Sequence, residues 1–99
     1  MNAETALRRA LMRLFAEARV TANIGNIRSI PWASATFSGT RHELQLHLSD
    51  LSGCDPIDGI GEREFDLPGH ILIDIAATEI GRDGEDRLVA VEALTVESD

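Results

Sequence analysis

The residues best suited to chemistry gather in the middle of the chain. The stretch RHELQLH holds His42, Glu43 and His47 and comes close to the zinc-protease motif, in which two helical histidines four residues apart bind the metal and a glutamate acts as base. Here the two histidines are five residues apart. An odd step puts two strand side chains on opposite faces, and in a helix it separates them by roughly 140°. The spacing therefore predicts no shared metal ion.

Residues 49–69 are rich in glycine, aspartate and proline and predict a long loop. Its carboxylates suggest calcium, but Cys54 stands where an EF-hand loop needs its first acid. A nucleophilic Cys54 would need a basic partner, which the sequence does not place beside it. We therefore predict no metal, cofactor or catalytic residue here. The acids considered as calcium ligands are Asp50, Asp55, Asp58, Glu62 and Glu64.

Composition predicts one globular domain over residues 1–99. The chain is 43% hydrophobic and 26% charged, and no stretch has the roughly 20 apolar residues of a membrane span. A single cysteine excludes an internal disulfide, and arginines interrupt the apolar run at the N-terminus, so we read no signal peptide. These features favour a cytoplasmic protein that spans no membrane.

The net charge of −8 is unevenly distributed. Residues 1–49 hold six arginines and three acids, whereas residues 50–99 hold three arginines and fourteen acids. The basic half can pair with the acidic half of the same chain or of a second copy. An acidic chain with one tryptophan and no tyrosine lacks the phosphate-attracting field and stacking platform of a nucleic-acid binder.

Apolar residues at steps of three and four predict a helix over about residues 3–20. Asn2 suits its N-cap, and Asn23 and Gly25 are candidate terminators. Arg9 and Arg13 lie on its polar side, where they could meet an acidic partner. The apolar arc consists of Leu7, Leu11, Leu14, Phe15 and Ala18.

Alternation about Gly39 predicts a hairpin over about residues 31–48, with Gly39 and Thr40 as its loop. That register pairs Phe37 with His42 on a core face. It also sets Trp32 across from His47 on the outer face, where the pair could contact a partner.

A second hairpin is predicted over about residues 70–97. One face of it carries Ile71, Ile73, Ile75 and Ala77 together with Val89, Val91 and Ala93, and joins the core. The other face is half apolar, so it needs a cover that a single helix cannot supply. Its apolar residues are Leu72, Ile80, Leu88, Leu94 and Val96, beside Asp74 and Glu92.

These elements predict an α+β domain in which an N-terminal helix packs on a four-stranded antiparallel sheet built from two hairpins. Its predicted core joins the helix residues to Phe37, Leu44, Leu46, Ile71, Ile73 and Ile75.

The phrases WASATFSGTRHEL, DLPGHILIDIA and VEALTVE resemble those of a small group of short, uncharacterised bacterial proteins, over most of residues 31–97. This resemblance implies no site, cofactor or activity. The order RHELQLHL, LPGH, ALTVE is similar to phage tail-completion proteins, although these carry extra helical sequence between the hairpins. That likeness implies a structural role.

Three functions remain open at this stage. The first is a non-catalytic interaction or assembly module that associates with itself, as a homodimer, or with another protein through the half-apolar face or a sheet edge. The second is a small-molecule binding domain, with the ligand between the open sheet face and the acidic loop. The third is an enzyme, which requires two of the following residues to converge: His42, Cys54, His70 and Asp74.

Overall fold

The computed structural model describes residues 2–49 and 55–97, which form one α-helix, a short 3-10 helix and a five-stranded antiparallel sheet. The predicted α+β class and N-terminal helix are confirmed. The prediction of four strands in two hairpins is wrong, because a short strand directly after the helix makes a fifth. The elements are α1 (Ala3–Glu17), β1 (Thr21–Ile24), β2 (Arg28–Ala33), β3 (Ser38–Ser49), η1 (Ile60–Glu62), β4 (His70–Asp83) and β5 (Asp86–Glu97).

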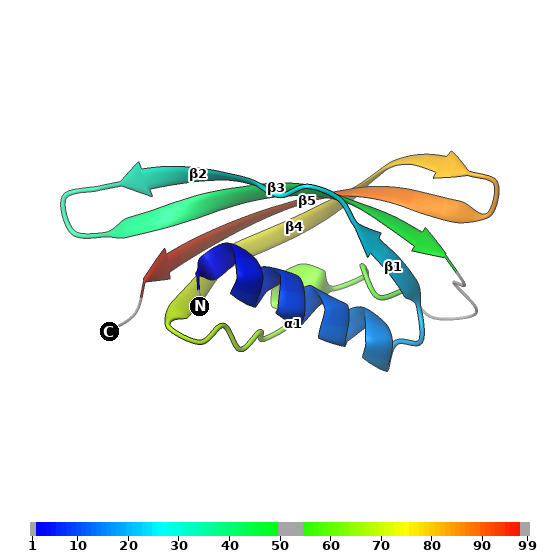
Figure 1. Ribbon diagram of the computed structural model, residues 1–99, viewed down its shortest axis with the longest axis horizontal. Coiled ribbons are helices and arrows are strands. Elements are labelled where there is room, and N and C mark those ends of the chain that lie inside the picture. The colour runs from blue at the N-terminus through cyan, green and yellow to red at the C-terminus, as the bar shows by residue number, and fades with distance from the viewer. Residues whose placement is uncertain (1, 50–54, 98–99) are drawn as a thin grey trace.

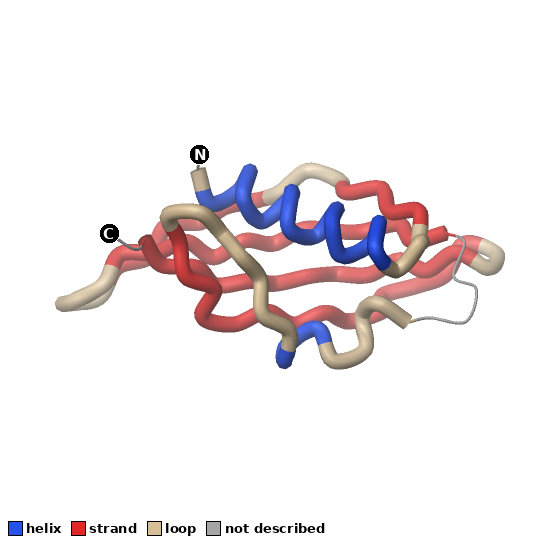
Figure 2. Tube along the Cα trace, turned by 90° about the horizontal axis from the view of Figure 1, so that it is seen from below, coloured by secondary structure: helices blue, strands red, loops and turns tan. Residues whose placement is uncertain are grey.

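The two central strands of the sheet are β3 and β5, and β4 forms one edge. The other edge is divided, because β2 pairs with the first half of β3 and β1 with the second half. The helix and the segment that leads into β4 lie on the same side of the sheet (Figures 1 and 2). We call that side the covered face and the opposite side the uncovered face.

Local interactions set both ends of the helix. The Asn2 side chain accepts a 2.8 Å hydrogen bond from the Thr5 amide, which confirms the predicted N-cap. The helix ends earlier than predicted, at Glu17, because Arg19 adopts a left-handed conformation with φ of 58° and turns the chain into β1. Asn23 and Gly25, the predicted terminators, lie in or directly after that strand.

The core lies between the helix and the covered face. Alternate residues of β3 and β5 point into it, and the register joins Leu44 to Val91 and Leu46 to Val89. Burying a leucine of this kind stabilises the fold by about 1.5–3 kcal/mol. The predicted core residues confirmed in this cluster are Leu7, Leu11, Leu14, Phe15, Leu44, Leu46 and Ile75.

The register predicted for the first hairpin is wrong. Its turn lies at residues 34–37 instead of Gly39 and Thr40, and Ala33 pairs with Ser38. Gly39 lies within β3 because Trp32 packs on it: a Cβ there would overlap the Thr95 carbonyl and lie 2.7 Å from two Trp32 ring atoms. The shifted turn leaves Phe37 59% exposed, so it is not a core residue.

The second hairpin departs from simple alternation. The register of β4 against β5 shifts between Leu72 and Asp74, so Ile73 is an extra, bulged residue without a partner on β5. Residues of β4 before Ile73 therefore lie on the opposite face from the one that simple alternation predicted. Leu72 therefore packs on the core instead of the uncovered face. Ile71 and Ile73, predicted in the core, are 53% and 54% exposed.

The segment before β4 completes the covered face. Pro56, Ile57, Ile60 and Leu67 are buried, although residues 55–69 form no strand. The Arg87 guanidinium on β5 donates to Asp55 Oδ1 at 2.9 Å and to Glu79 Oε1 at 2.6 Å, which ties the segment to the sheet. Asp50 and Cys54, considered above for calcium binding and catalysis, lie outside the described residues.

Candidate functional site: the uncovered face of the sheet

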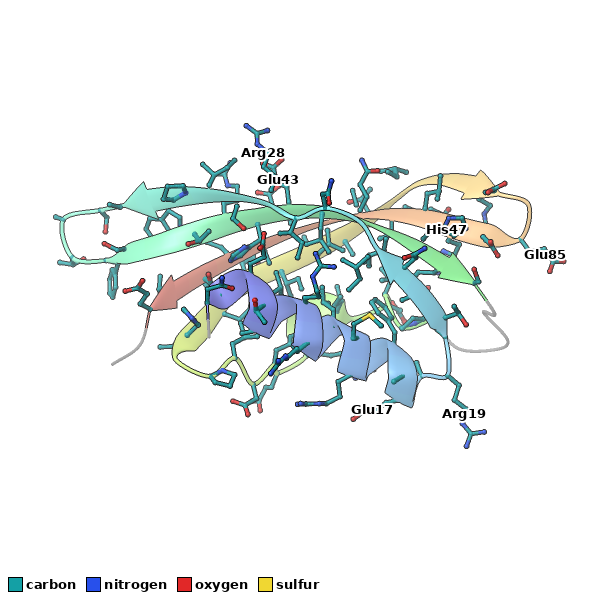
Figure 3. The ribbon with its side chains drawn as sticks, in the orientation of Figure 1. Glu17, Arg19, Arg28, Glu43, His47 and Glu85 are labelled. Carbon is teal, nitrogen blue, oxygen red and sulfur yellow. The ribbon has the colours of Figure 1, made fainter. Side chains whose placement is uncertain are left out.

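The uncovered face is built mainly by every second residue of the five strands. Residues that alternate with the buried leucines of β3, such as Arg41 and Gln45, point away from the helix, and Leu94 and Ala90 are their partners on β5. Figure 3 shows Arg28 and Glu43 projecting from this face, on the opposite side of the sheet from α1. One strand thus supplies the core with one set of residues and this surface with the other.

Charged residues of both signs occupy the middle of the face. Glu43 and Glu92 are directly opposite each other in the register of β3 and β5, an arrangement in which like charges repel. Two arginines offset this repulsion: Arg28 Nη1 lies 3.9 Å from Glu43 Oε2, and Arg41 Nε lies 3.5 Å from Glu92 Oε1. All four side chains are exposed enough for each pair to contribute no more than about 1 kcal/mol.

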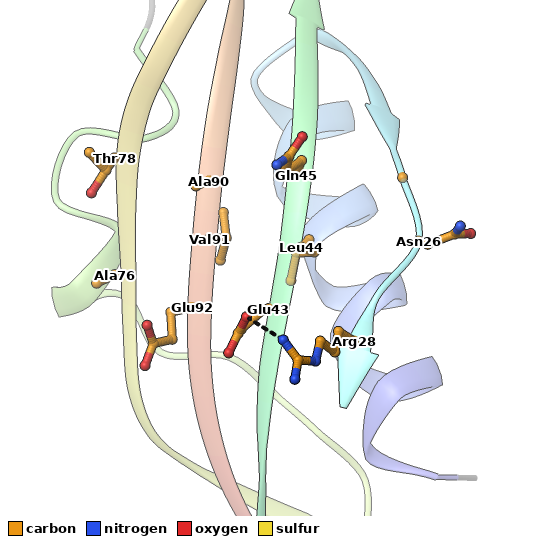
Figure 4. Close-up of a pocket in the computed structure, with 11 residues that line it drawn as sticks. Asn26, Arg28, Glu43, Leu44, Gln45, Ala76, Thr78, Ala90, Val91 and Glu92 are labelled. Carbon is orange, nitrogen blue, oxygen red and sulfur yellow. Dashed lines mark ion pairs between the residues drawn. The ribbon is translucent and has the colours of Figure 1, made fainter. Parts of the chain in front are cut away.

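An open hollow of about 590 Å³ adjoins these charges. Its floor is low because Ala76, Thr78 and Ala90 are small and stand side by side on β4 and β5 (Figure 4). The acidic segment that was predicted to close a ligand site over this face packs on the covered face instead, with Ile57 and Ile60 in the core. Residues 55–69 of that segment therefore do not line this hollow, and a small-molecule site on the face stays a prediction.

Apolar side chains flank the charged middle. One row across the sheet lies at one end of the face. It contains Trp32 on β2, Gly39 on β3, Val96 on β5 and Ile71 on β4, each directly opposite the next. Val96 is buried and Trp32 half-buried, whereas Ile71 is 53% exposed. Leu94 lies in the next row towards the charged middle, and Leu88 lies on the other side of that middle. Both leucines are half-buried.

The predicted contact between Trp32 and His47 does not form, because the register of the hairpin is different. His47 pairs with Asn23 on β1 and with Leu88 on β5. Its Nε2 atom lies 2.8 Å from Asp86 Oδ2, so it joins β3 to the start of β5. The two residues share the uncovered face but lie in rows far apart along it.

Arg9 and Arg13 lie away from this face. Both are exposed on α1 and border a small hollow shared with Asp66 and Pro68 of the segment before β4. The basic side of the helix is therefore next to an acidic part of the same chain.

The residues considered for catalysis are divided between the two faces. His42 points into the covered face and is 1% exposed, whereas Asp74 pairs with Leu94 and points to the other side. His42 and His47 also lie on opposite faces, as their odd spacing predicted. Among the described residues, no three His, Cys, Asp or Glu side chains are placed to share a metal ion.

His42 instead forms a chain of polar contacts that was not predicted and that is buried at His42 and Thr95. Its Nδ1 atom lies 3.0 Å from Ser29 Oγ, and its Nε2 atom lies 3.0 Å from Thr95 Oγ1. Only the register brings these residues together: Ser29 is directly opposite His42 on β2, and Thr95 is one row away on β5. A serine beside a histidine can act as a nucleophile, but none of the described hollows of the surface includes Ser29.

Both edges of the sheet resist pairing with another strand. On one edge β2 contains Pro31, which lacks an amide hydrogen, and residues 25–27 separate it from β1. On the other edge β4 carries two register shifts, between Leu72 and Asp74 and between Glu79 and Gly81. Bulges and prolines of this kind block strand addition.

Comparisons with known proteins give no match: no protein-family model, curated protein or solved structure matches this chain. This outcome agrees with the resemblance to uncharacterised proteins, which implied no activity. Across the described residues, neither α1 nor η1 has the length and apolar character that a bilayer-spanning helix requires.

Proposed function

We propose that this chain is a non-catalytic interaction module that associates with a second copy of itself through the uncovered face of its sheet. The observation that carries the proposal is a face with apolar residues at both ends and charges of both signs in the middle, over which no part of residues 2–49 and 55–97 is layered, on a sheet whose edges are poorly suited to strand addition. An antiparallel sheet with one such half-apolar face gains stability when that face is covered.

The size of the face supports a dimer. The molecule extends 46 Å along the sheet and 21 Å across it, so the face fits within a rectangle of at most about 970 Å². A stable interface buries roughly 800 Å² on each partner. A domain of 99 residues also buries a smaller fraction of the surface of its unfolded chain, roughly 60–70%, than a larger domain does, so association adds apolar burial that the monomer lacks.

The charge pattern supports a partner with the same surface. A twofold interface brings one surface patch against an identical patch, so it must be complementary to itself. Arg28 and Arg41 lie beside the acidic pair of Glu43 and Glu92, and a copy can therefore meet each sign with the opposite one. A partner of uniform charge would leave one of the two signs unmatched.

Leu94→Glu tests the proposal directly. Leu94 is half-buried on the uncovered face, between Arg41 on β3 and Asp74 on β4, so a new carboxylate there replaces an apolar surface with a charge without entering the core. We expect the wild-type chain to sediment as a dimer and Leu94→Glu as a monomer, with the urea midpoint changed far less than the association.

The matched control is Met12→Glu, which places the same carboxylate on α1 at a side chain that is 43% exposed. It should leave the dimer intact. A wild-type chain that remains monomeric at high concentration would contradict self-association. Association that Met12→Glu weakens as much as Leu94→Glu would place the interface elsewhere. Assemblies larger than a dimer would favour the structural role that the likeness to phage tail-completion proteins implies.

A further inference from the structure

The hollow on the uncovered face has a charged end and a low end. Figure 4 shows Glu43 and Glu92 at the charged end. Gln45, Ala90 and Thr78 line the other end, which is low because Ala90 and Thr78 are small and stand side by side on β5 and β4. A hollow of about 590 Å³ with such a floor suits large side chains that project from a facing surface, since well-packed interfaces leave few gaps.

The same face carries a row of large apolar side chains, which we call the end row: Trp32, Val96 and Ile71. Ile71 is 53% exposed and Trp32 is half-buried. The end row and the row of Ala90 are six residues apart on β5, which is roughly 20 Å along the strand. The end row therefore cannot reach the hollow of its own chain, whereas the end row of a second copy can.

Two identical faces that pack with their strands aligned have two possible twofold axes. The axis lies in the plane between the faces and runs either along the strands or across them. An axis along the strands that covers the whole face sets each row against the same row of the copy. It brings the Glu43 and Glu92 carboxylates of both copies together, and like charges in one row repel. An axis across the strands avoids this, because it sets each row against a different one.

The charges indicate where an axis across the strands passes. With the axis between the row of Arg41 and the row of Glu43, each Arg41 lies over the Glu43 of the copy. Within the described chain, Arg41 meets Glu92 through Nε at 3.5 Å, which leaves its two Nη groups for a second carboxylate. The row of Glu43 lies near the middle of the sheet, between the turns at residues 34–37 and 84–85, so this axis keeps most of the face covered.

We propose that the low end of the hollow is the receptor for the end row of a second copy, and that Arg41 of each copy binds Glu43 of the other. The axis that joins these charges also sets the end row over Ala90 and Thr78, so shape and charge agree on one arrangement. The strands of the two copies then run in opposite directions. This inference rests on the proposed self-association and adds its orientation.

Reversed charges test the contact between Arg41 and Glu43. Arg41→Glu sets a carboxylate against Glu43 of the copy at both contacts, so the dimer dissociation constant should rise at least about tenfold in sedimentation equilibrium. Arg41→Glu/Glu43→Arg restores opposite charges at both contacts and should regain most of this loss. The matched control is Arg41→Glu/Glu17→Arg, which has the same net charge. Glu17 is exposed on α1, so this control should associate as weakly as Arg41→Glu.

Ala90→Phe tests the hollow itself. Ala90 lies on the uncovered face, so the ring fills the low end without entering the core. Association should weaken at least about tenfold, with little change in the urea midpoint. Leu88→Phe is the control, because it enlarges a side chain of the same strand outside the hollow and should leave the dimer intact.

The orientation is overturned if Arg41→Glu/Glu43→Arg associates no better than Arg41→Glu, or if Ala90→Phe associates as tightly as a dimeric wild-type chain. Either result leaves self-association standing. A wild-type chain that stays monomeric contradicts self-association, and the orientation with it.

Discussion

The two faces of one sheet differ in nearly every physical property, although the same strands build both. On the covered face Leu44 and Leu46 are at most 4% exposed and pack under α1. On the uncovered face Gln45, which stands between these two leucines in the sequence, and Arg41, three residues before Leu44, are exposed. Alternate residues of β3 and β5 therefore either pack in the core or form the surface, so a residue of the surface can change without changing the core.

Polar groups also behave differently on the two faces. His42 and Thr95 on the covered face are each 1% exposed and satisfy each other through hydrogen bonds, because an unpaired polar group buried there costs about 1–3 kcal/mol. The ion pairs of the uncovered face are exposed, so water replaces them at little cost. Mutations on the covered face should therefore change folding, and mutations on the uncovered face should change association.

The largest effect is expected from Leu11→Ala on the covered side. Leu11 is fully buried under the sheet, so its truncation removes burial and leaves a cavity, at a cost of about 2–5 kcal/mol in the free energy of unfolding. Met12→Ala, one residue later but 43% exposed, should stay within about 0.5 kcal/mol. Urea unfolding followed by circular dichroism measures both, and equal losses would show that α1 packs differently.

Gly39→Ala should follow, with a loss of about 1–3 kcal/mol from overpacking, because the new Cβ would overlap the Thr95 carbonyl and Trp32. Gly25→Ala is its control, because its Cβ would meet only the Gln45 carbonyl at 3.6 Å. The same unfolding experiment compares the two. A neutral Gly39→Ala would mean that Trp32 does not rest on the strand.

Acid should weaken the fold through His42. Its pKa is lowered in the folded state from the ordinary value of 6.5, mainly by burial, so the unfolded chain binds more protons. This contribution to stability is full above pH 6.5 and is lost as the pH falls from there towards the folded pKa. Urea unfolding at several pH values between 7.5 and 5 measures the slope, and His42→Gln should make it shallower. A slope that His42→Gln leaves unchanged would assign the acid sensitivity to other groups.

The smallest effect is expected from Arg28→Ala on the uncovered face. Its ion pair with Glu43 is 3.9 Å long, and the Arg28 side chain is 75% exposed, so the loss in stability should be below about 1 kcal/mol and smaller still in high salt. If Arg28 contributes to the proposed interface, dimer dissociation will increase more than unfolding does. Sedimentation and urea unfolding of the same sample separate the two effects.

Local patterns predicted the parts of the fold that depend on neighbouring residues. The spacing of Leu7, Leu11 and Leu14 and the Asn2 cap predicted α1, since a helix is defined by contacts within one or two turns. Alternation also placed Leu88, Leu94 and Val96 together on one face of β5, where they lie. Whether they bind a partner remains a prediction.

The parts that failed depend on contacts between distant segments. Leu72 lies on the other face from the predicted one because a bulge at Ile73 reverses the alternation. The apolar residues of this segment contain no signal for the extra residue. The hairpin turn moved because Trp32 needs a glycine beneath it in the neighbouring strand, which made Gly39 a strand residue.

The sequence by itself therefore determined the helix, the antiparallel hairpins, the long connection before β4 and the odd spacing that separates His42 from His47. Tertiary structure alone decided the register, the fifth strand and the position of the acidic segment beneath the sheet. It also brought Glu4, Ser29, His42 and Thr95 together, four residues spread over 91 positions of the chain. The physical reason is the distance in sequence between the residues involved. Side-chain periodicity is a property of one segment, whereas a register shift or a chain of polar contacts depends on residues from distant segments.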